Sequence, residues 1–188
     1  MQTGADTQGM NTPAIEILQI ARNLGSADEA SFMQAIGPVV ERSPWVVERA
    51  WRRAPFENLN AVHAALCACI LEASDDEQLA LLRAHPELAG SEAQAGTMTD
   101  ESQSEQARLG LHALDAATLA RLTRLNQRYR ERFGYPLLVA LRLHQRLETV
   151  LQEAEQRLAH SPQQERQIAL AQITEVMRGR LFGSTTPS

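Results

Sequence analysis

Apolar residues recur along this chain at intervals of three and four positions, which is the spacing of one face of an α-helix. The clearest example is the segment 115–134, where Leu119, Leu122, Leu125 and Tyr129 form one apolar stripe among polar and charged residues. Such a stripe is typical of a helix that packs one face against a core. The pattern therefore predicts a helical protein.

Signals that start and stop helices divide the chain into several such segments. A Ser followed three residues later by Glu or Gln forms a capping box, and this spacing occurs at Ser26, Ser74 and Ser161. Proline, which is tolerated at the first helical position, follows Thr12 and Ser43. The expected helical segments cover 12–25, 26–37, 43–54, 58–73 (capped by Asn58 or Asn60), 74–85, 99–111, 115–134, 143–160 and 161–183.

Two segments break this pattern. Residues 135–141 are apolar and partly β-branched, which is typical of a strand, but no second strand is visible to pair with them. We interpret them as the buried start of the helix that continues through 143–160. Residues 86–98 contain two glycines and no helical period, so we expect the longest irregular stretch there.

Length and composition fit a single domain. The 188 residues are 44% hydrophobic and 22% charged, as in an ordinary globular protein with one core. We expect one compact all-α domain of about eight helices, without a sheet, over residues 13–182. A disordered polar leader over 1–12 and a flexible tail over 183–188 complete the expected organisation.

Charge and hydropathy exclude some classes of partner. The formal net charge is −5, which argues against a protein that binds nucleic acid through its phosphates. No apolar run approaches the roughly 20 residues that a membrane-spanning helix needs. The first residues lack the basic and apolar regions of a signal peptide. We therefore expect a cytoplasmic protein that binds neither nucleic acid nor a membrane.

Metal and cofactor motifs are absent from the sequence. Cys67 and Cys69 are two residues apart and point to different sides of their expected helix, so we interpret them as buried structural thiols. The five histidines form no HExxH motif, and we expect no metal site among them. There is also no phosphate-binding loop, dinucleotide fingerprint or nucleophile elbow. Side chains and backbone must then supply the chemistry without a cofactor.

A histidine at the end of one expected helix is the first candidate for that chemistry. The sequence LLRAHPELAG, residues 81–90, places His85 directly before Pro86. Proline disfavours helical geometry in the preceding residue, so the chain leaves the helix at His85. A cationic histidine there suits the helix dipole, which is one interpretation. The other is that Pro86 holds an imidazole that titrates near neutral pH at the mouth of a pocket.

Three polar residues form the second candidate. Ser102, Glu105 and Gln106 are three and four positions apart, so they share one face of the expected helix over 99–111. Their hydroxyl, carboxylate and amide groups suit a substrate that carries several N–H and C=O groups. A solvated polar face is the alternative interpretation.

Backbone amides and arginines complete the candidates. If Pro136 lies in the first turn of a helix, the amides of 137–139 have no intrahelical partner and form a cradle for an anion or a carbonyl. The alternative is that these residues are simply part of the core. Arg142 follows the cradle and Arg180 lies near the end of the last helix; either could clamp a carboxylate or remain a surface arginine.

Taken together, these motifs resemble one enzyme family. LLRAHPELAG at 81–90, TDESQSEQARLGL at 99–111 and LNQRYRERFGYPLLVALR at 125–142 resemble, in order and spacing, the OHCU decarboxylases of urate breakdown. OHCU is 2-oxo-4-hydroxy-4-carboxy-5-ureidoimidazoline. The likeness extends to SPWVVERAWRRAPFENL near the N-terminus and to the closing RL, and so covers roughly residues 14–182.

The resemblance implies an all-α, usually dimeric enzyme without cofactor or metal that converts the small molecule OHCU to (S)-allantoin. His85 would be the catalytic acid and base, and Glu105 would orient the imidazole or hold the substrate hydroxyl. The substrate-binding residues implied by the family motifs are Pro86, Ser102, Gln106, the backbone of Leu137, Leu138, Val139, Ala140 and Leu141, and Arg180.

The chain departs from the family pattern in two places. Tyr135 and Leu137 stand where FGFPF is usual, and Leu109 stands where a small residue is usual. Neither change removes a functional group. Arg142 and Arg178 are alternatives to Arg180 as the substrate arginine. A helical ligand-binding or adaptor module without catalysis, or an enzyme for a different ureido acid, remains an alternative function.

Overall fold

Side-chain caps start most of the helices. The computed structural model describes residues 17, 19–20, 23 and 25–183. Within that part of the chain Asn58, Ser74, Thr99, Asp115 and Ser161 each accept a hydrogen bond from a backbone amide of the helix that they precede. Such caps satisfy amide groups that have no partner inside the helix. The leader expected over 1–12, the tail after Gly183 and much of the helix expected over 12–25 lie outside the described residues.

The described residues form nine α-helices, two short 3-10 helices and no strand. They are α2 (Glu29–Ile36), η1 (Gly37–Val39), α3 (Pro44–Trp51), α4 (Leu59–Leu71), α5 (Asp75–Ala84), α6 (Ser91–Ala95), α7 (Asp100–Arg108), α8 (Ala116–Phe133), η2 (Leu141–Leu143), α9 (Leu147–Arg157) and α10 (Pro162–Phe182). The predicted all-α fold class is confirmed.

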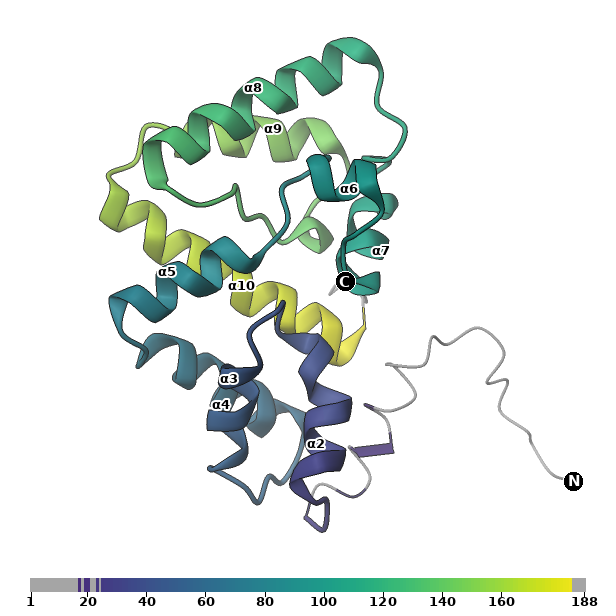
Figure 1. Ribbon diagram of the computed structural model, residues 1–188, viewed down its shortest axis with the longest axis vertical. Helices are drawn as coiled ribbons and strands as arrows, with labels where there is room; N and C mark the ends of the chain where they lie inside the picture. The colour runs from purple at the N-terminus through teal and green to yellow at the C-terminus, as the bar shows by residue number, and fades with distance from the viewer. Residues whose placement is uncertain (1–16, 18, 21–22, 24, 184–188) are drawn as a thin grey trace, which may run out of the picture.

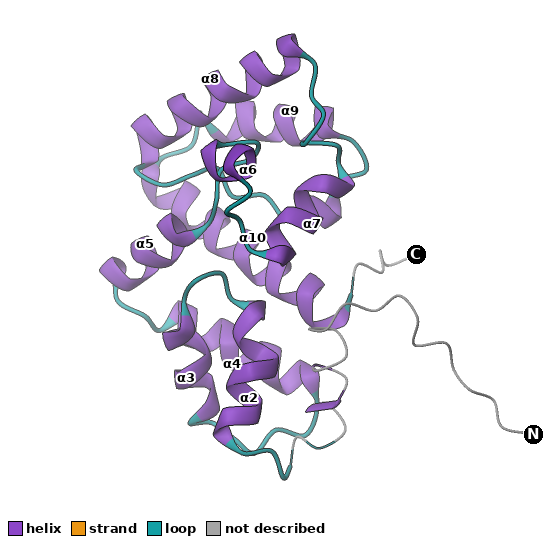
Figure 2. Ribbon diagram, turned by 45° about the vertical axis from the view of Figure 1, so that its right-hand side comes forward, coloured by secondary structure: helices purple, strands orange, loops and turns teal. Residues whose placement is uncertain are grey.

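Helix α10 is the central element of the molecule. Figures 1 and 2 show it running between α2, α3 and α4 on one side and α8 and α9 on the other. It contacts α4, α5, α8 and both 3-10 helices. Its buried residues Leu170, Ile173, Met177 and Leu181 recur at helical spacing and join the core. One core therefore reaches both sides of α10, and α10 can present side chains to either side.

The segment 135–141 differs from its prediction. Gly134 ends α8 in the left-handed conformation, and the chain then runs without helix until η2 begins at Leu141. Pro136 is therefore not in the first turn of a helix, and the predicted cradle of helical amides at 137–139 does not form. Proline disfavours helical geometry in Tyr135, and side chains from later helices hold the following backbone extended.

Smaller differences concern helix boundaries. Residues 86–98 contain the short helix α6, although we expected them to be irregular. Asp28 caps α2 through the amide of Ser31, so the capping box expected at Ser26 is wrong. The capping box at Ser74 is confirmed with both of its hydrogen bonds, and Asn58 caps α4 in preference to Asn60.

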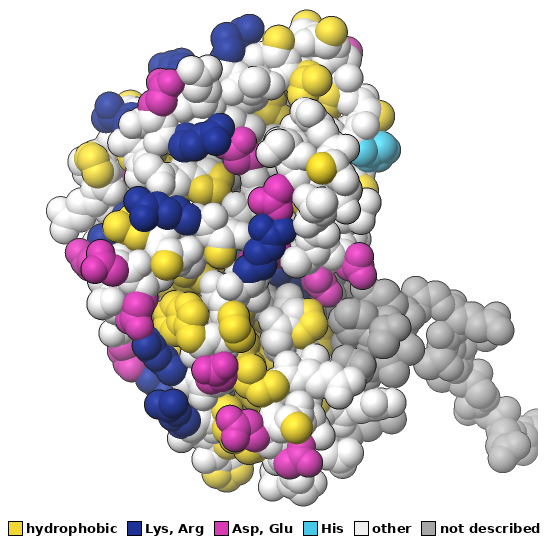
Figure 3. All heavy atoms as spheres, viewed as in Figure 1, with side chains coloured by type: hydrophobic (Ala, Val, Ile, Leu, Met, Phe, Trp, Pro, Cys, Tyr) yellow, Lys and Arg dark blue, Asp and Glu magenta, His cyan; other side chains and the backbone are white. Residues whose placement is uncertain are grey.

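Cysteine and charge distributions follow from the fold. Cys69 is buried and Cys67 is half-buried, and both are free thiols. The Sγ atom of Cys67 lies 3.6 Å from Nε2 of His63, which is four residues earlier on the same helix. No helix within the described residues is long and apolar enough to cross a membrane. Figure 3 shows acidic and basic side chains interspersed over one face of the molecule.

Candidate active site

His85 lies where α5 ends. Its backbone is extended, with φ −79° and ψ 141°, as the following Pro86 favours. Its Nδ1 lies 3.0 Å from the carbonyl oxygen of Leu81. A carbonyl only accepts, so Nδ1 carries the proton, and in the neutral ring Nε2 has a free lone pair. The carbonyl of the preceding helical turn thus fixes both the tautomer and the orientation of the ring.

Burial keeps this imidazole neutral. His85 is buried, and loss of solvent lowers its pKa to about 4. The hydrogen bond to Leu81 and the charge of Glu41 raise the pKa, whereas the charges of Arg180 and Arg42 lower it. At neutral pH the free enzyme therefore presents a base at this position and not an imidazolium.

Helix α7 supplies the polar residues opposite His85. Thr99 caps α7, so Ser102, Glu105 and Gln106 project from its first turns toward the site. Ser102 and Gln106 are buried, whereas the side chain of Glu105 is 33% exposed. The helical spacing read from the sequence thus brings all three residues to one cavity, as we expected.

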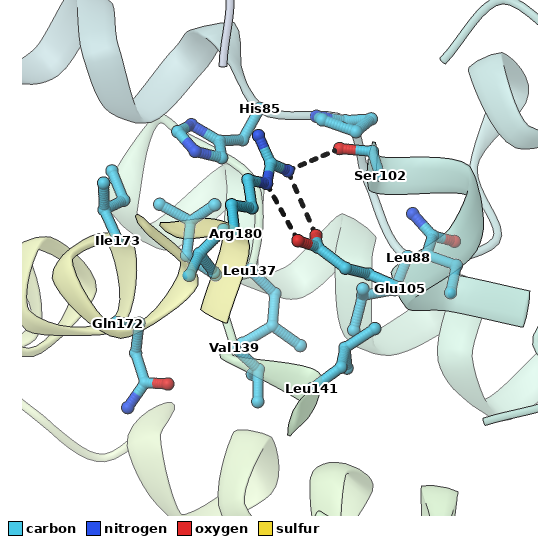
Figure 4. A pocket seen from close by; sticks show the side chains of 14 residues that line it. His85, Leu88, Ser102, Glu105, Leu137, Val139, Leu141, Gln172, Ile173 and Arg180 are labelled. Atoms are coloured by element: carbon cyan, nitrogen blue, oxygen red, sulfur yellow. Dashed lines mark hydrogen bonds and ion pairs between the residues drawn. The ribbon is translucent and has the colours of Figure 1, made fainter. Parts of the chain in front are cut away.

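Arg180 is the centre of an ion-pair network at this cavity. Its Nε and Nη2 donate to the two oxygens of Glu105 at 2.8 and 3.1 Å, and Nη2 also donates to the Ser102 hydroxyl at 3.2 Å. Its Nη1 lies 3.0 Å from Glu41 Oε2. Figure 4 shows its guanidinium beside the His85 ring and facing Ser102 and Glu105. A cation is therefore fixed next to the neutral histidine.

Gln106 has a different environment from the one we expected. Its Oε1 accepts from the amide of Ala89 at 2.8 Å, and its Nε2 donates to the carbonyl of Glu87 at 3.2 Å. Both ends of the amide thus bind the chain that follows His85. In the free enzyme Gln106 holds this loop against α7, and its predicted contact with substrate stays a prediction.

Most of the remaining cavity wall is apolar. Leu137, Leu138, Val139 and Leu141 line it from the extended segment after α8. Arg157 binds the Leu138 carbonyl at 2.8 Å, and Gln172 binds the amide of Ala140 at 2.8 Å. These bonds hold the backbone of the segment in place from two later helices.

Most of the predicted site residues meet in this one cavity. His85, Pro86, Ser102, Glu105, Gln106, Leu137, Leu138, Val139, Leu141 and Arg180 all line it. Ala140 does not, and instead lines an adjoining hollow. The sequence interpretation missed Leu88, Gln172, Ile173 and Val176, which also line the cavity. Val176 lies four residues before Arg180 and Gln172 eight before it, so a search along that face of α10 would have found them.

The structure also distinguishes among the three candidate arginines. Arg142 is bound to Glu175 and lines the adjoining hollow, and the guanidinium of Arg178 lies over the ring of Phe182. Only Arg180 of the three lines the cavity that contains His85. Among the described residues, no group of three or more His, Cys, Asp or Glu side chains is arranged to hold a metal ion.

Comparisons with known proteins identify relatives over most of the chain. The family model for OHCU decarboxylase matches residues 25–182. The 2-oxo-4-hydroxy-4-carboxy-5-ureidoimidazoline decarboxylase of Halalkalicoccus jeotgali is 38% identical over 88% of this chain and 91% of its own length. The enzymes of that name from Amia calva and Mus musculus are each 38% identical, over 85% and 84% of this chain and 91% and 88% of their own lengths.

A solved structure agrees with these sequence relatives. The crystal structure of (S)-allantoin synthase superposes with a TM-score of 0.68 at 29% sequence identity, over 87% of this chain and 53% of that chain. Family model, relatives and fold therefore agree with the motifs around His85. This chain belongs to the OHCU decarboxylase family.

Proposed function

We propose that this chain decarboxylates OHCU to (S)-allantoin in urate breakdown, with His85 as the group that moves the proton. As a member of its family it is a carboxy-lyase. The observation that carries the proposal is the neutral His85 ring, fixed by Leu81 and set beside the cation of Arg180 in one cavity. Base, cation and carboxylate are thus held together before substrate binds.

The reaction suits a site with these groups. When the bond between the ring carbon and the carboxylate breaks, CO2 leaves and its bonding electrons pass toward the adjacent C=N of the ring. The hydroxyl on the same carbon loses a proton and becomes a carbonyl, the neighbouring ring carbon gains a proton, and the ring nitrogen that received the electrons takes up a proton from water. Because the substrate itself accepts the electrons, the proposal requires no cofactor and no metal.

His85 is suited to both proton transfers. Its free Nε2 takes the hydroxyl proton and returns a proton to the neighbouring carbon on one face of the ring, which gives a single enantiomer. The anionic substrate raises the pKa of His85 when it binds, because a nearby negative charge favours the imidazolium. General acid–base catalysis of this kind typically supplies about 100–10,000-fold in rate.

The remaining groups bind and orient the substrate. Arg180 binds a substrate oxygen through its planar guanidinium. Glu105, once free of Arg180, holds the hydroxyl or orients the imidazole, and Ser102 and Gln106 contact the ureido and ring groups. The segment 137–141 packs against the ring through its apolar side chains and backbone.

The direct test follows freshly generated OHCU by circular dichroism. Uncatalysed decay gives racemic allantoin, so we expect the protein to speed the appearance of an optically active product. An unchanged rate would disprove the assignment. Tight binding of allantoin without turnover would instead favour a helical ligand-binding module.

A substitution tests the role of His85 itself. His85→Asn removes the titratable ring, and we expect turnover to fall by about 100-fold or more while the helical spectrum stays intact. Retained turnover would exclude His85 as the acid and base. A homodimer and a cytoplasmic location belong to the same proposal, and light scattering and cell fractionation test them.

A further inference from the structure

Glu41 lies behind the cavity wall and belongs to no motif found in the sequence. It lies two residues after the end of η1 and three before the start of α3. Its side chain is 0% exposed, although a carboxylate loses much solvation energy on burial. A buried charge of this kind needs charged or polar partners, and those partners identify its role.

All the hydrogen-bond partners of Glu41 lie at the active site. Its Oε2 accepts from the Ser102 hydroxyl at 2.8 Å and from Arg180 Nη1 at 3.0 Å. The hydroxyl of Thr99, the cap of α7, donates to both of its oxygens at 3.0 Å. One carboxylate thus joins the first turn of α7 to the end of α10, directly beside His85.

Arg180 therefore has two carboxylate partners with different environments. Glu41 is fully buried and does not line the cavity, whereas Glu105 is 33% exposed and does. Two carboxylates face the guanidinium of Arg180, so an anionic substrate must replace one of them in order to pair with it. Of the two, only Glu105 can turn toward solvent without leaving a buried carboxylate unpaired.

The space around Arg180 also requires a change on binding. The cavity that His85 and Arg180 both line has a volume of about 40 Å³, well below the roughly 300 Å³ at the lower end for ligand sites. A second hollow of about 340 Å³ adjoins it, and the two share Glu105, Leu141, Val176 and Arg180 as walls. The Arg180–Glu105 ion pair thus lies between the larger hollow and His85.

We propose that Glu41 is a positioning residue, a permanent counter-ion that holds Arg180 and Ser102 in place while Glu105 releases Arg180 to the substrate. The inference rests on the proposed decarboxylase function and deepens it. Burial alone raises the pKa of Glu41, but the charge of Arg180 and the Ser102 hydroxyl outweigh burial and leave it below its ordinary value. Glu41 thus remains ionised and keeps its hold on Arg180 throughout turnover.

The test separates substrate binding from chemistry. Glu41→Gln keeps the size of the side chain and one acceptor oxygen but removes the charge that holds Arg180. We expect KM for OHCU to rise about tenfold, the loss typical of one charge-assisted hydrogen bond, while kcat changes by less than about threefold. A merely structural role would lower kcat through a loss of folded enzyme and leave KM unchanged.

A double-mutant cycle tests whether Glu41 acts through Arg180. In a protein that already carries Arg180→Gln and so lacks the cation, we expect the addition of Glu41→Gln to change kcat/KM by less than about twofold relative to the single variant. Glu165→Gln is the matched control, because Glu165 is also a fully buried glutamate paired with an arginine but is not among the groups around His85. It should lower the melting temperature without raising KM.

Other outcomes overturn the inference. An unchanged KM in Glu41→Gln, a KM rise in Glu165→Gln as well, or additive effects in the cycle would each show that Glu41 does not position Arg180. If Glu41→Gln does not fold, Glu41→Asp is the second variant. It shortens the side chain by one methylene, which moves the carboxylate away from Arg180, and should raise KM about threefold. Failure of the wild-type protein to turn over OHCU would disprove the proposed function instead, so the two failures are distinguishable.

Discussion

The side chains of Arg157 and Arg180 are both almost fully buried near the same pocket, and they serve different purposes. Arg157 is 3% exposed and Arg180 is 5% exposed, and each is paired with a glutamate that is 0% exposed. A hydroxyl also donates to each glutamate, from Tyr129 at Glu165 and from Ser102 at Glu41. By burial and chemistry the two clusters are nearly alike.

They differ in what else the arginine binds. Arg157 donates to Glu165, to Glu153 and to the carbonyl of Leu138, and His160 Nδ1 donates to the other oxygen of Glu165. None of these groups except Leu138 lines the cavity. The Arg157 cluster therefore fixes the pocket wall from behind. Each arginine also has one partly exposed partner, Glu153 at 32% and Glu105 at 33%, but only Arg180 and its partner line the cavity itself.

The difference shows how a buried ion pair can serve stability or function. The Arg157 pair does not line the cavity, so no ligand there can replace its partners, and it holds the backbone in place. The Arg180 pair lines the cavity, so a ligand can replace its partly exposed partner Glu105 at lower cost. The comparison predicts that changes at Arg157 mainly lower stability and that changes around Arg180 mainly lower activity.

The largest effect is expected at Arg157 itself. Arg157→Met leaves Glu165 buried without its cation, and we expect the free energy of unfolding to fall by about 3–5 kcal/mol. Urea denaturation followed by circular dichroism measures this loss. Arg121→Met is the matched control, because Arg121 also binds two glutamates, Glu148 and Glu155, but at the surface, where solvent screens the pairs and we expect little loss. Equal losses in the two variants would contradict the comparison.

A second prediction uses pH, because burial holds His85, the histidine beside Arg180, in its neutral form. The pKa of His85 is about 4 in the folded protein, against about 6.5 for an ordinary histidine. Between these values the unfolded chain binds the extra proton, so stability is full above pH 6.5 and is lost as the pH falls toward 4. Burial raises the pKa of Tyr129 in the other cluster far above this range.

The expected contribution of His85 over this window is about 3 kcal/mol, from 1.36 kcal/mol per pKa unit. Urea denaturation at pH 6.5 and at pH 4.5 should therefore show a smaller loss of stability in His85→Asn than in the wild-type protein. Tyr129→Phe should leave the pH dependence unchanged. An identical pH dependence in His85→Asn and wild type would show that His85 is not held neutral by burial.

A third prediction concerns Glu105, where we expect a loss of activity with little loss of stability, the opposite of the effect at Arg157. Glu105→Gln removes the exchangeable carboxylate, and we expect turnover to fall about 100-fold while the free energy of unfolding falls by less than about 1 kcal/mol. Glu92→Gln is the control, because Glu92 is also a partly exposed glutamate, at 34%, and is paired with Arg42. Turnover should not change in that variant. A large loss of stability with normal turnover in Glu105→Gln would place Glu105 with the structural ion pairs.

Local sequence patterns predicted the part of this site that consists of His85, Ser102 and Glu105. Pro86 fixed the position of His85, and helical spacing brought Ser102 and Glu105 to one face, because each relation spans only a few residues. Glu41 gave no such signal, since it pairs with Arg180 across 139 residues and nothing in its neighbours indicates burial. Only the folded chain brings these two residues together.

The segment 135–141 illustrates the same limit. A short apolar run reads equally as strand, buried helix or extended core, because its length covers too few periods to distinguish them. What holds it extended is Arg157 at the Leu138 carbonyl and Gln172 at the Ala140 amide, both on helices that follow it in the chain. Helix existence and most caps were predictable, whereas this long-range tethering was not.

The smallest predicted effect concerns two tyrosines at the Arg157 cluster. The Tyr129 hydroxyl donates to Glu165 and accepts from Arg157, whereas the buried Tyr135 hydroxyl has no hydrogen-bond partner among the described residues. Tyr129→Phe should lower the free energy of unfolding by about 1–2 kcal/mol, which lowers Tm by about 2–8 °C in a domain of this size. Tyr135→Phe removes an unpaired buried hydroxyl and should leave Tm unchanged or raise it. Thermal denaturation of the two variants measures the difference in Tm. The two rings lie 6.1 Å apart in similar surroundings. An equal fall of Tm in both variants would therefore show that Tm reports ring packing rather than the hydrogen bond to Glu165.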